Sequence, residues 1–159
     1  EILIGLVGSE MCIRDRYAHG NEPSHHITHM YNYVNRPWRT QELVDSVLYN
    51  QYFNAPDGLS GNEDCGQMSA WYILNSMGFY QVCPGKPVYS IGRPLFNEAT
   101  VHLKDGKSFK VIAHNNSRDN KYVRSIVLNG NKLETPFFTH QDIVDGGTLE
   151  LTMGSEPLK

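Results

Sequence analysis

Apolar positions early in the chain recur with helical spacing. Ile27, Met30, Tyr31 and Val34 follow i, i+3, i+4 and i+7. This spacing predicts a helix that begins after Pro23 and buries these side chains in the core.

Two further helices are predicted downstream. One runs from about Pro37 to Phe53 and ends before a Pro-Asp-Gly turn; its apolar stripe consists of Leu43, Val44, Val47, Leu48 and Tyr52. The other runs from about Gln67 to Gly78, whose missing Cβ suits a left-handed C-cap. Because this third helix is apolar nearly all round, we expect it to be buried.

Beyond Cys83 the period of the pattern changes to two residues. Short β-branched or alternating runs predict strands at 88–91, 100–103, 108–113, 122–128, 132–137 and 148–153. Asp105-Gly106 and Asn129-Gly130 supply the positive φ angles of tight hairpin turns. The fold class predicted is therefore α+β, with helices over residues 17–83 and an antiparallel, sandwich-like β segment over 84–159.

Composition excludes two classes of partner. The 159 residues carry 14 Lys and Arg against 17 Asp and Glu, a net charge of −3. This balance offers no basic surface for nucleic acid. No window approaches the about 18 to 20 apolar residues that a membrane-spanning helix needs.

Residues 1–16 are interpreted as a translated artefact. The stretch LVGSEMCIRDR back-translates in one frame into a transposase-type sequencing adapter. We therefore expect this segment to have no native structure and to be fused to a truncated gene. Cys65 and Cys83 then remain, and they form neither a disulfide framework nor a metal motif.

Polar residues concentrate in two loops of the helical half, at 19–29 and 57–67. In the second loop, glycines flank Asn62, Glu63 and Asp64, which permits close backbone approach to a ligand. Adjacent carboxylates at a helix entrance can hold a hard cation, activate water or cap the helix. The pattern alone leaves these roles open.

The first loop holds four of the seven histidines. His25 and His29 have the i, i+4 spacing of a zinc pair, although the glutamate of a HExxH motif is absent. His25 and His26 are alternatively candidates for substrate hydroxyl contacts. In a third interpretation the histidines are partly buried and bonded to backbone carbonyls.

Four stretches resemble glycoside hydrolase family 92, the calcium-dependent exo-acting α-mannosidases. They are GNEPSHH at 20–26, NRPWRTQ at 35–41, PDGLSGNEDCGQMSAWYILNSMGFYQVCPG at 56–85 and IVDGGTLELTMG at 143–154. The twelve-residue string GNEDCGQMSAWY is the most specific of these. The resemblance covers essentially everything after residue 16.

The resemblance implies a fold and a mechanism. Residues 17–83 would be the last helices of an (α/α)6 catalytic barrel, and 84–159 a terminal β segment. Inversion at the anomeric carbon would need a general acid and a general base about 6.5 to 9.5 Å apart. Asp64 is carried over as the base and Glu63 is a second catalytic candidate. Asn62 replaces an aspartate of relatives, and the acid would lie upstream.

The same resemblance implies Ca²⁺ as cofactor and a mannose-containing glycan as substrate. Asn21 and Glu22 are the expected metal ligands, and Asn21, Glu22, His25, His26 and Asn62 the expected substrate contacts. The missing N-terminal part of the same chain is the expected partner, and the enzyme is expected in the periplasm, on the cell surface or secreted. The alternatives are a non-catalytic carbohydrate-binding or structural β module and a zinc hydrolase.

Overall fold

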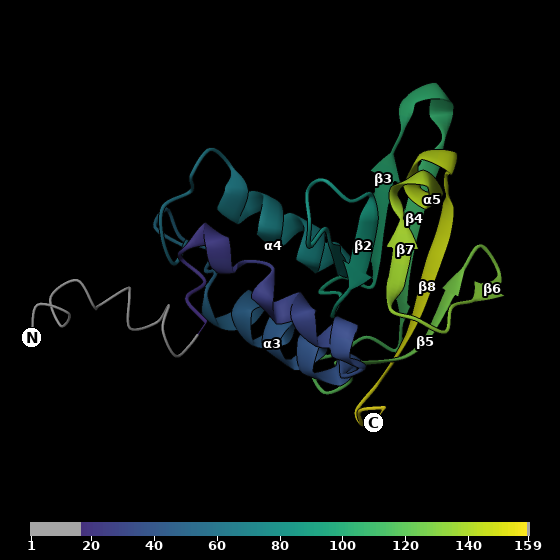
Figure 1. Cartoon of the computed structure of the whole chain (residues 1–159), viewed down its shortest axis with the longest axis horizontal. Coiled ribbons are helices and arrows are strands. Elements are labelled where there is room, and N and C mark those ends of the chain that lie inside the picture. Colours follow the sequence, from purple (N-terminus) through teal and green to yellow (C-terminus); the bar gives the residue numbers. More distant parts are fainter. Residues whose placement is uncertain (1–16, 159) are drawn as a thin grey trace, which may run out of the picture.

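A computed structural model describes residues 17–158, in which helices precede strands along the chain (Figure 1). The interpretation of residues 1–16 as adapter lies outside the described residues. The α+β class is confirmed. Within residues 17–158 no helix is long and apolar enough to cross a membrane.

The helical half comprises two 3-10 segments and two α-helices. Their bounds are η1 Glu22–Ser24, η2 Ile27–Val34, α3 Pro37–Asn50 and α4 Gln67–Met77. Proline occupies the first turn of η1 and of α3, where its missing N–H costs nothing. Gly78 ends α4 at φ 101°, as predicted.

The face that η2 buries is not the predicted one. Ile27, Met30 and Val34 are 40%, 43% and 61% exposed, whereas Thr28, His29 and Asn32 are buried. The polar side chains are tolerated inside because His29 and Asn32 hydrogen-bond to groups of α4 and β2. Burial of α4 is likewise one-sided, since Trp71 is fully buried and Ile73 is 56% exposed.

The strands form two sheets. A three-stranded antiparallel sheet has the order β1-β2-β7, with β1 Phe79–Tyr80, β2 Val88–Ile91 and β7 Phe137–Thr139. A five-stranded sheet has the order β3-β4-β8-β5-β6, with β3 Glu98–His102, β4 Ser108–His114, β5 Tyr122–Leu128, β6 Asn131–Lys132 and β8 Gly147–Gly154. A short 3-10 turn, η3 Lys104–Gly106, joins β3 to β4.

The prediction of a purely antiparallel segment is wrong at one pair, because β4 and β8 run parallel. Helix α5, His140–Asp145, lies between β7 and β8 and turns the chain so that β8 enters beside β4 in the same direction. Thr139 and Asp142 form a capping box that fixes the start of α5. The Asn129-Gly130 turn has the predicted positive φ angles.

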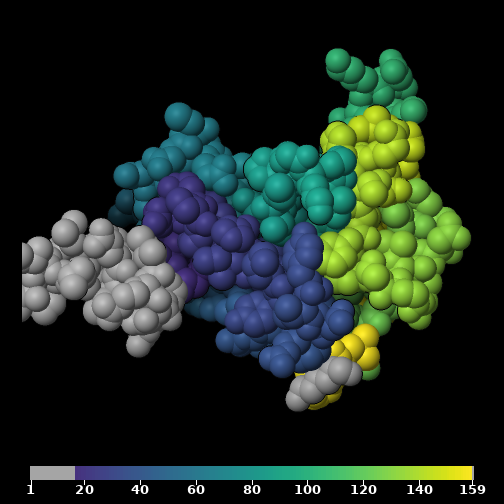
Figure 2. All heavy atoms as spheres, viewed as in Figure 1, coloured from purple at the N-terminus to yellow at the C-terminus, as the bar shows by residue number. Residues whose placement is uncertain are grey.

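Two hydrophobic cores stabilise the molecule. The first lies between the two sheets and α5, and its fully buried members are Phe109, Leu149 and Leu151. The second joins α3 to α4 through Val44 and Trp71. The space-filling view shows the segment before α3 (purple) lying between the regions of α3 and α4 (Figure 2).

Buried polar contacts attach the helical half to the strands. Arg93 Nε lies 3.0 Å from Asp45 Oδ1, and both side chains are at least nine-tenths buried. Tyr122 donates its hydroxyl to Glu42 Oε1 at 2.9 Å. These contacts fix the direction of α3, whose C-terminal end borders the two polar loops.

Candidate active site

The two polar loops meet at their glycines. A Cβ on Gly61 would lie 2.6 Å from the carbonyl oxygen of Gly20, and a Cβ on Gly20 would clash with the carbonyl of Ser60. Only glycine permits this backbone approach. It brings Asn21 and Glu22 of the first loop next to the second loop.

Glu22 and Asp64 form the centre of the candidate site. Two carboxyl groups can hydrogen-bond only while one carries a proton, and two like charges side by side repel. The hydrogen bond to Glu22, followed by its charge, raises the pKa of Asp64 above the usual aspartate value. Glu22 Oε1 is buried and has no hydrogen-bond partner among the described residues.

The backbone that presents Asp64 is left-handed. Asp64, Cys65 and Gly66 have φ angles of 47°, 58° and 91°. Left-handed geometry costs a non-glycine residue about 1–2 kcal/mol, and such strain is concentrated at functional sites. It is held here by hydrogen bonds from the first N–H groups of α4 to the carbonyls of Glu63 and Asp64.

Glu63 is engaged in a different contact. Its carboxylate accepts from the Ser69 N–H at 3.0 Å and from the Ser69 hydroxyl at 2.7 Å. These two bonds lower the pKa of Glu63. The side chain therefore satisfies an otherwise free donor at the start of α4, and Asp64 is left to face Glu22.

His19 organises the interior behind the loops. Tyr52 donates its one hydroxyl proton to the Met68 carbonyl, so His19 Nε2 must donate to the Tyr52 oxygen at 2.6 Å. His19 Nδ1 then accepts from the Tyr17 hydroxyl at 2.5 Å. Burial lowers the pKa of His19 to about 3, so the ring is neutral.

His25 extends the same network. Its Nε2 donates to the His19 carbonyl at 2.9 Å and its Nδ1 accepts from Gln67 Nε2 at 3.2 Å. Trp71 Nε1 donates to the His25 carbonyl. Since His25 is 1% exposed, the structure gives it a supporting place inside and no free ring nitrogen for a substrate hydroxyl.

The sequence did not predict the residues that hydrogen-bond to His19 and His25. Gln67, Tyr52 and Tyr17 hold the two histidines in one tautomer, yet only Gln67 lies in a specific motif, as the first residue of α4. The signal that could have identified Gln67 is its place directly after the left-handed Gly66. Trp71 is fully buried in the core.

The histidine pair is not arranged for zinc. His29 Nε2 donates to Asn75 Oδ1 at 2.8 Å and its Nδ1 bonds to Ser90 Oγ at 3.1 Å. Both rings therefore have both nitrogens occupied. Among residues 17–158 no group of three or more His, Cys, Asp or Glu residues could hold a metal ion.

The remaining predicted residues are Asn21, His26 and Asn62, which lie on the same two loops as Glu22 and Asp64. Asn21 precedes η1, and its side chain makes no capping bond there. His26 and Asn62 are exposed. Oxygen donors that fit a hard cation are thus Glu22 Oε1, the Asp64 carboxylate and the Asn21 amide oxygen.

The sequence and fold of this chain are similar to those of known glycoside hydrolases. The family model described as "Glycosyl hydrolase family 92 catalytic domain" matches residues 8–155. The match includes part of the segment 1–16, whose interpretation as adapter stays a prediction. A curated protein of Arthroderma benhamiae, described as an uncharacterized secreted glycosidase, is 31% identical over 97% of this chain and 21% of its own length.

Two solved structures from Bacteroides thetaiotaomicron are similar in sequence and fold. The α-mannosidase BT3965, solved with mannoimidazole, is 44% identical over 89% of this chain and 19% of its own, with a TM-score of 0.85. The inverting mannosidase BT2199 is 41% identical over 99% of this chain and 21% of its own, with a TM-score of 0.83. The chain thus spans about a fifth of these relatives, and it belongs to glycosyl hydrolase family 92.

Proposed function

We propose that this chain is the C-terminal part of an inverting, calcium-dependent exo-α-mannosidase that acts on α-mannosides of N-glycans or mannan. The observation that carries the proposal is the proximity of Glu22 to Asp64. The Glu22 carboxyl raises the pKa of Asp64 above the usual aspartate value, which strengthens Asp64 as a general base.

Asp64 acts as the base that removes a proton from the attacking water. The Asn62 amide can accept and donate hydrogen bonds but cannot take the proton, so it orients the water or a substrate hydroxyl. Glu63 is tied to Ser69 and contributes to the position of Asp64. The general acid lies in the part of the enzyme upstream of this chain.

Calcium fits the donors of the first loop. Glu22 Oε1 is a buried oxygen without a hydrogen-bond partner among the described residues, which a cation would satisfy. Glu22 and Asn21 would hold the ion, and the ion would supply positive charge for binding vicinal sugar hydroxyls.

The chain by itself is proposed to be inactive. Ile27, Met30 and Val34 on η2 and Ile73 on α4 form exposed apolar surfaces on the helical half. The missing N-terminal part of the enzyme is the partner that covers such surfaces, as the last helices of an (α/α)6 barrel require. An extracytoplasmic or secreted location follows from the glycan substrate and from the secreted relative.

The alternative of a carbohydrate-binding β module finds less support. The sheet aromatics Phe79, Phe109 and Phe138 lie in the core between the sheets. Phe96 is exposed but lies in the loop before β3. Phe79, Phe109 and Phe138 therefore pack the core and do not form a sugar-stacking platform.

The test uses the enzyme extended through its upstream reading frame. Asp64→Asn should lower kcat on an aryl α-mannoside by about 10²- to 10⁴-fold, the usual contribution of general-base catalysis, with little change in KM. Glu63→Gln is the matched control on the same turn and should retain most of the turnover. A wild-type kcat for Asp64→Asn would remove Asp64 from the mechanism.

A further inference from the structure

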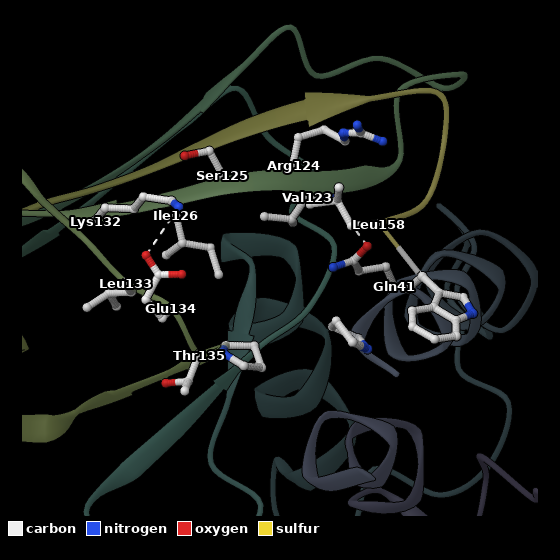
Figure 3. A pocket seen from close by; sticks show the side chains of 13 residues that line it. Gln41, Val123, Arg124, Ser125, Ile126, Lys132, Leu133, Glu134, Thr135 and Leu158 are labelled. Carbon is white, nitrogen blue, oxygen red and sulfur yellow. Dashed lines mark hydrogen bonds and ion pairs between the residues drawn. The ribbon is translucent and has the colours of Figure 1, made fainter. Parts of the chain in front are cut away.

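A hollow lies far from the carboxylate pair, where the N-terminal end of α3 meets β5 and the 132–136 segment (Figure 3). Its volume is about 190 Å³. Tyr52, which contacts His19, follows the opposite end of α3. Since α3 has 14 residues, the two places are roughly 20 Å apart along the helix.

One amide donor, on the largely buried Gln41, is directed into this hollow. Gln41 is 4% exposed, and its Oε1 accepts the Val123 N–H at 3.2 Å. The amide nitrogen has no hydrogen-bond partner among the described residues. Figure 3 shows that nitrogen turned toward the side where Ile126 and Glu134 lie. The donor is open to the hollow, so an acceptor of a ligand that enters can bond to it in place of water.

The other walls define the chemistry of the ligand. Trp38, Pro37, Pro136 and Ile126 supply flat or aliphatic surface. Glu134 supplies a hydrogen-bond acceptor. It forms an ion pair with Lys132 at 3.1 Å, so the two charges offset each other and the hollow does not favour a charged ligand. A hydroxyl group can accept from Gln41 and donate to Glu134, and a sugar ring also has an apolar C–H face for Trp38.

The volume of the hollow suits a ligand of one sugar ring. Pockets for drug-sized ligands measure about 300–1,000 Å³, so this hollow suits one small unit. We propose that it binds one neutral pyranose residue of a glycan, with Gln41 as the amide donor and Trp38 as the stacking surface. The proposal uses no residue of the Glu22–Asp64 site and stands apart from the proposed function.

The experiment titrates the 159-residue chain with methyl α-D-mannopyranoside and follows the indole N–H signals by NMR. The chain has two tryptophans, so Trp71, which is fully buried, serves as an internal reference. The Trp38 signal should shift in a saturable way with a Kd of about 1–10 mM, and the Trp71 signal should not move. Absence of saturable binding up to about 100 mM overturns the proposal.

Two variants locate the binding. Gln41→Glu keeps an acceptor for the Val123 N–H but removes the donor, and should weaken binding at least tenfold. Glu134→Ala changes an exposed side chain, leaves the fold intact and should weaken binding about fivefold. Unchanged affinity in both variants overturns the proposal.

Asp64→Asn is the control for the other site. It should leave the Trp38 titration unchanged even if it abolishes catalysis in the extended enzyme. Loss of the Trp38 response in Asp64→Asn would assign the bound sugar to the carboxylate site and overturn the proposal of a sugar site in the hollow. Failure of the kinetic test on Asp64, with the titration intact, would overturn only the proposed function.

Discussion

Glu22 lies close enough to Asp64 to raise the pKa of its carboxyl group, although the whole of α3 separates the two residues in the sequence. The contact exists because Gly20 and Gly61 let two loops approach at backbone distance. It places like charges together, which a protein tolerates where a proton, a cation or a substrate is to be bound.

This contact predicts that Asp64→Asn stabilises the chain at neutral pH. The raised pKa means that the folded state binds the proton more tightly than the unfolded state, so this contribution is present at low pH and is lost as the pH rises. The amide removes the repulsion, and Tm at pH 7 should rise by about 1–3 °C. At pH 3 the wild type and the variant should melt together.

Asp57→Asn provides the control for net charge, because Asp57 is exposed on the same loop. It should leave Tm unchanged at both pH values. A lower Tm for Asp64→Asn at pH 7 would mean that its charge stabilises the turn, contrary to the contact with Glu22.

Glu63 leads to the opposite prediction. Glu63→Ala removes both bonds to Ser69 and should lower Tm by about 2–4 °C, the size expected for loss of a helix cap in a chain of this length. Ser69→Ala removes the hydroxyl bond from the other side. The double variant should melt close to Glu63→Ala, and full additivity of the two losses would contradict the pairing.

The buried histidines predict sensitivity to acid. Burial lowers the pKa of His29 to about 4 and that of His19 to about 3, while the unfolded chain titrates near 6.5. Stability is therefore complete above pH 6.5 and falls as the pH drops toward 4, by up to about 1.4 kcal/mol per pH unit for each histidine.

Urea unfolding between pH 7 and pH 4.5 measures this slope. His29→Gln should lower stability at pH 7 and flatten the slope, whereas the exposed His140→Gln should change neither. A slope that is the same in His29→Gln and in the wild type would mean that His29 is not the titrating group.

Local signals predicted α3, α4 and most strands because each was specified by nearby residues. Proline opens α3, Gly78 ends α4, and the turn at Asn129 has the φ angles that Asn-Gly favours. The parallel pairing of β4 with β8 was not predictable in this way, since it depends on the path through α5.

The site was predictable in its position but not in its internal bonds. The motif residues Glu22 and Asp64 were chosen from the sequence, and their contact is a tertiary property. The inside of η2 was mispredicted because hydrophobicity ranks His29 and Asn32 as surface residues. Their hydrogen bonds to Asn75 and Ser90 make burial acceptable, and no pattern along the sequence reports such partners.

Calcium gives the last prediction, for the extended enzyme. A calcium-selective chelator should lower activity by at least tenfold, and added calcium should restore it, because Glu22 and Asn21 offer oxygen ligands. Zinc should not restore it, because both ring nitrogens of His25 and of His29 are already bonded within the protein.

Glu22→Gln should keep the fold but raise the calcium concentration needed for half-maximal activity by at least tenfold. Recovery with zinc alone would support the histidine pair as the metal site, and a calcium requirement unchanged in Glu22→Gln would place the ion elsewhere in the enzyme.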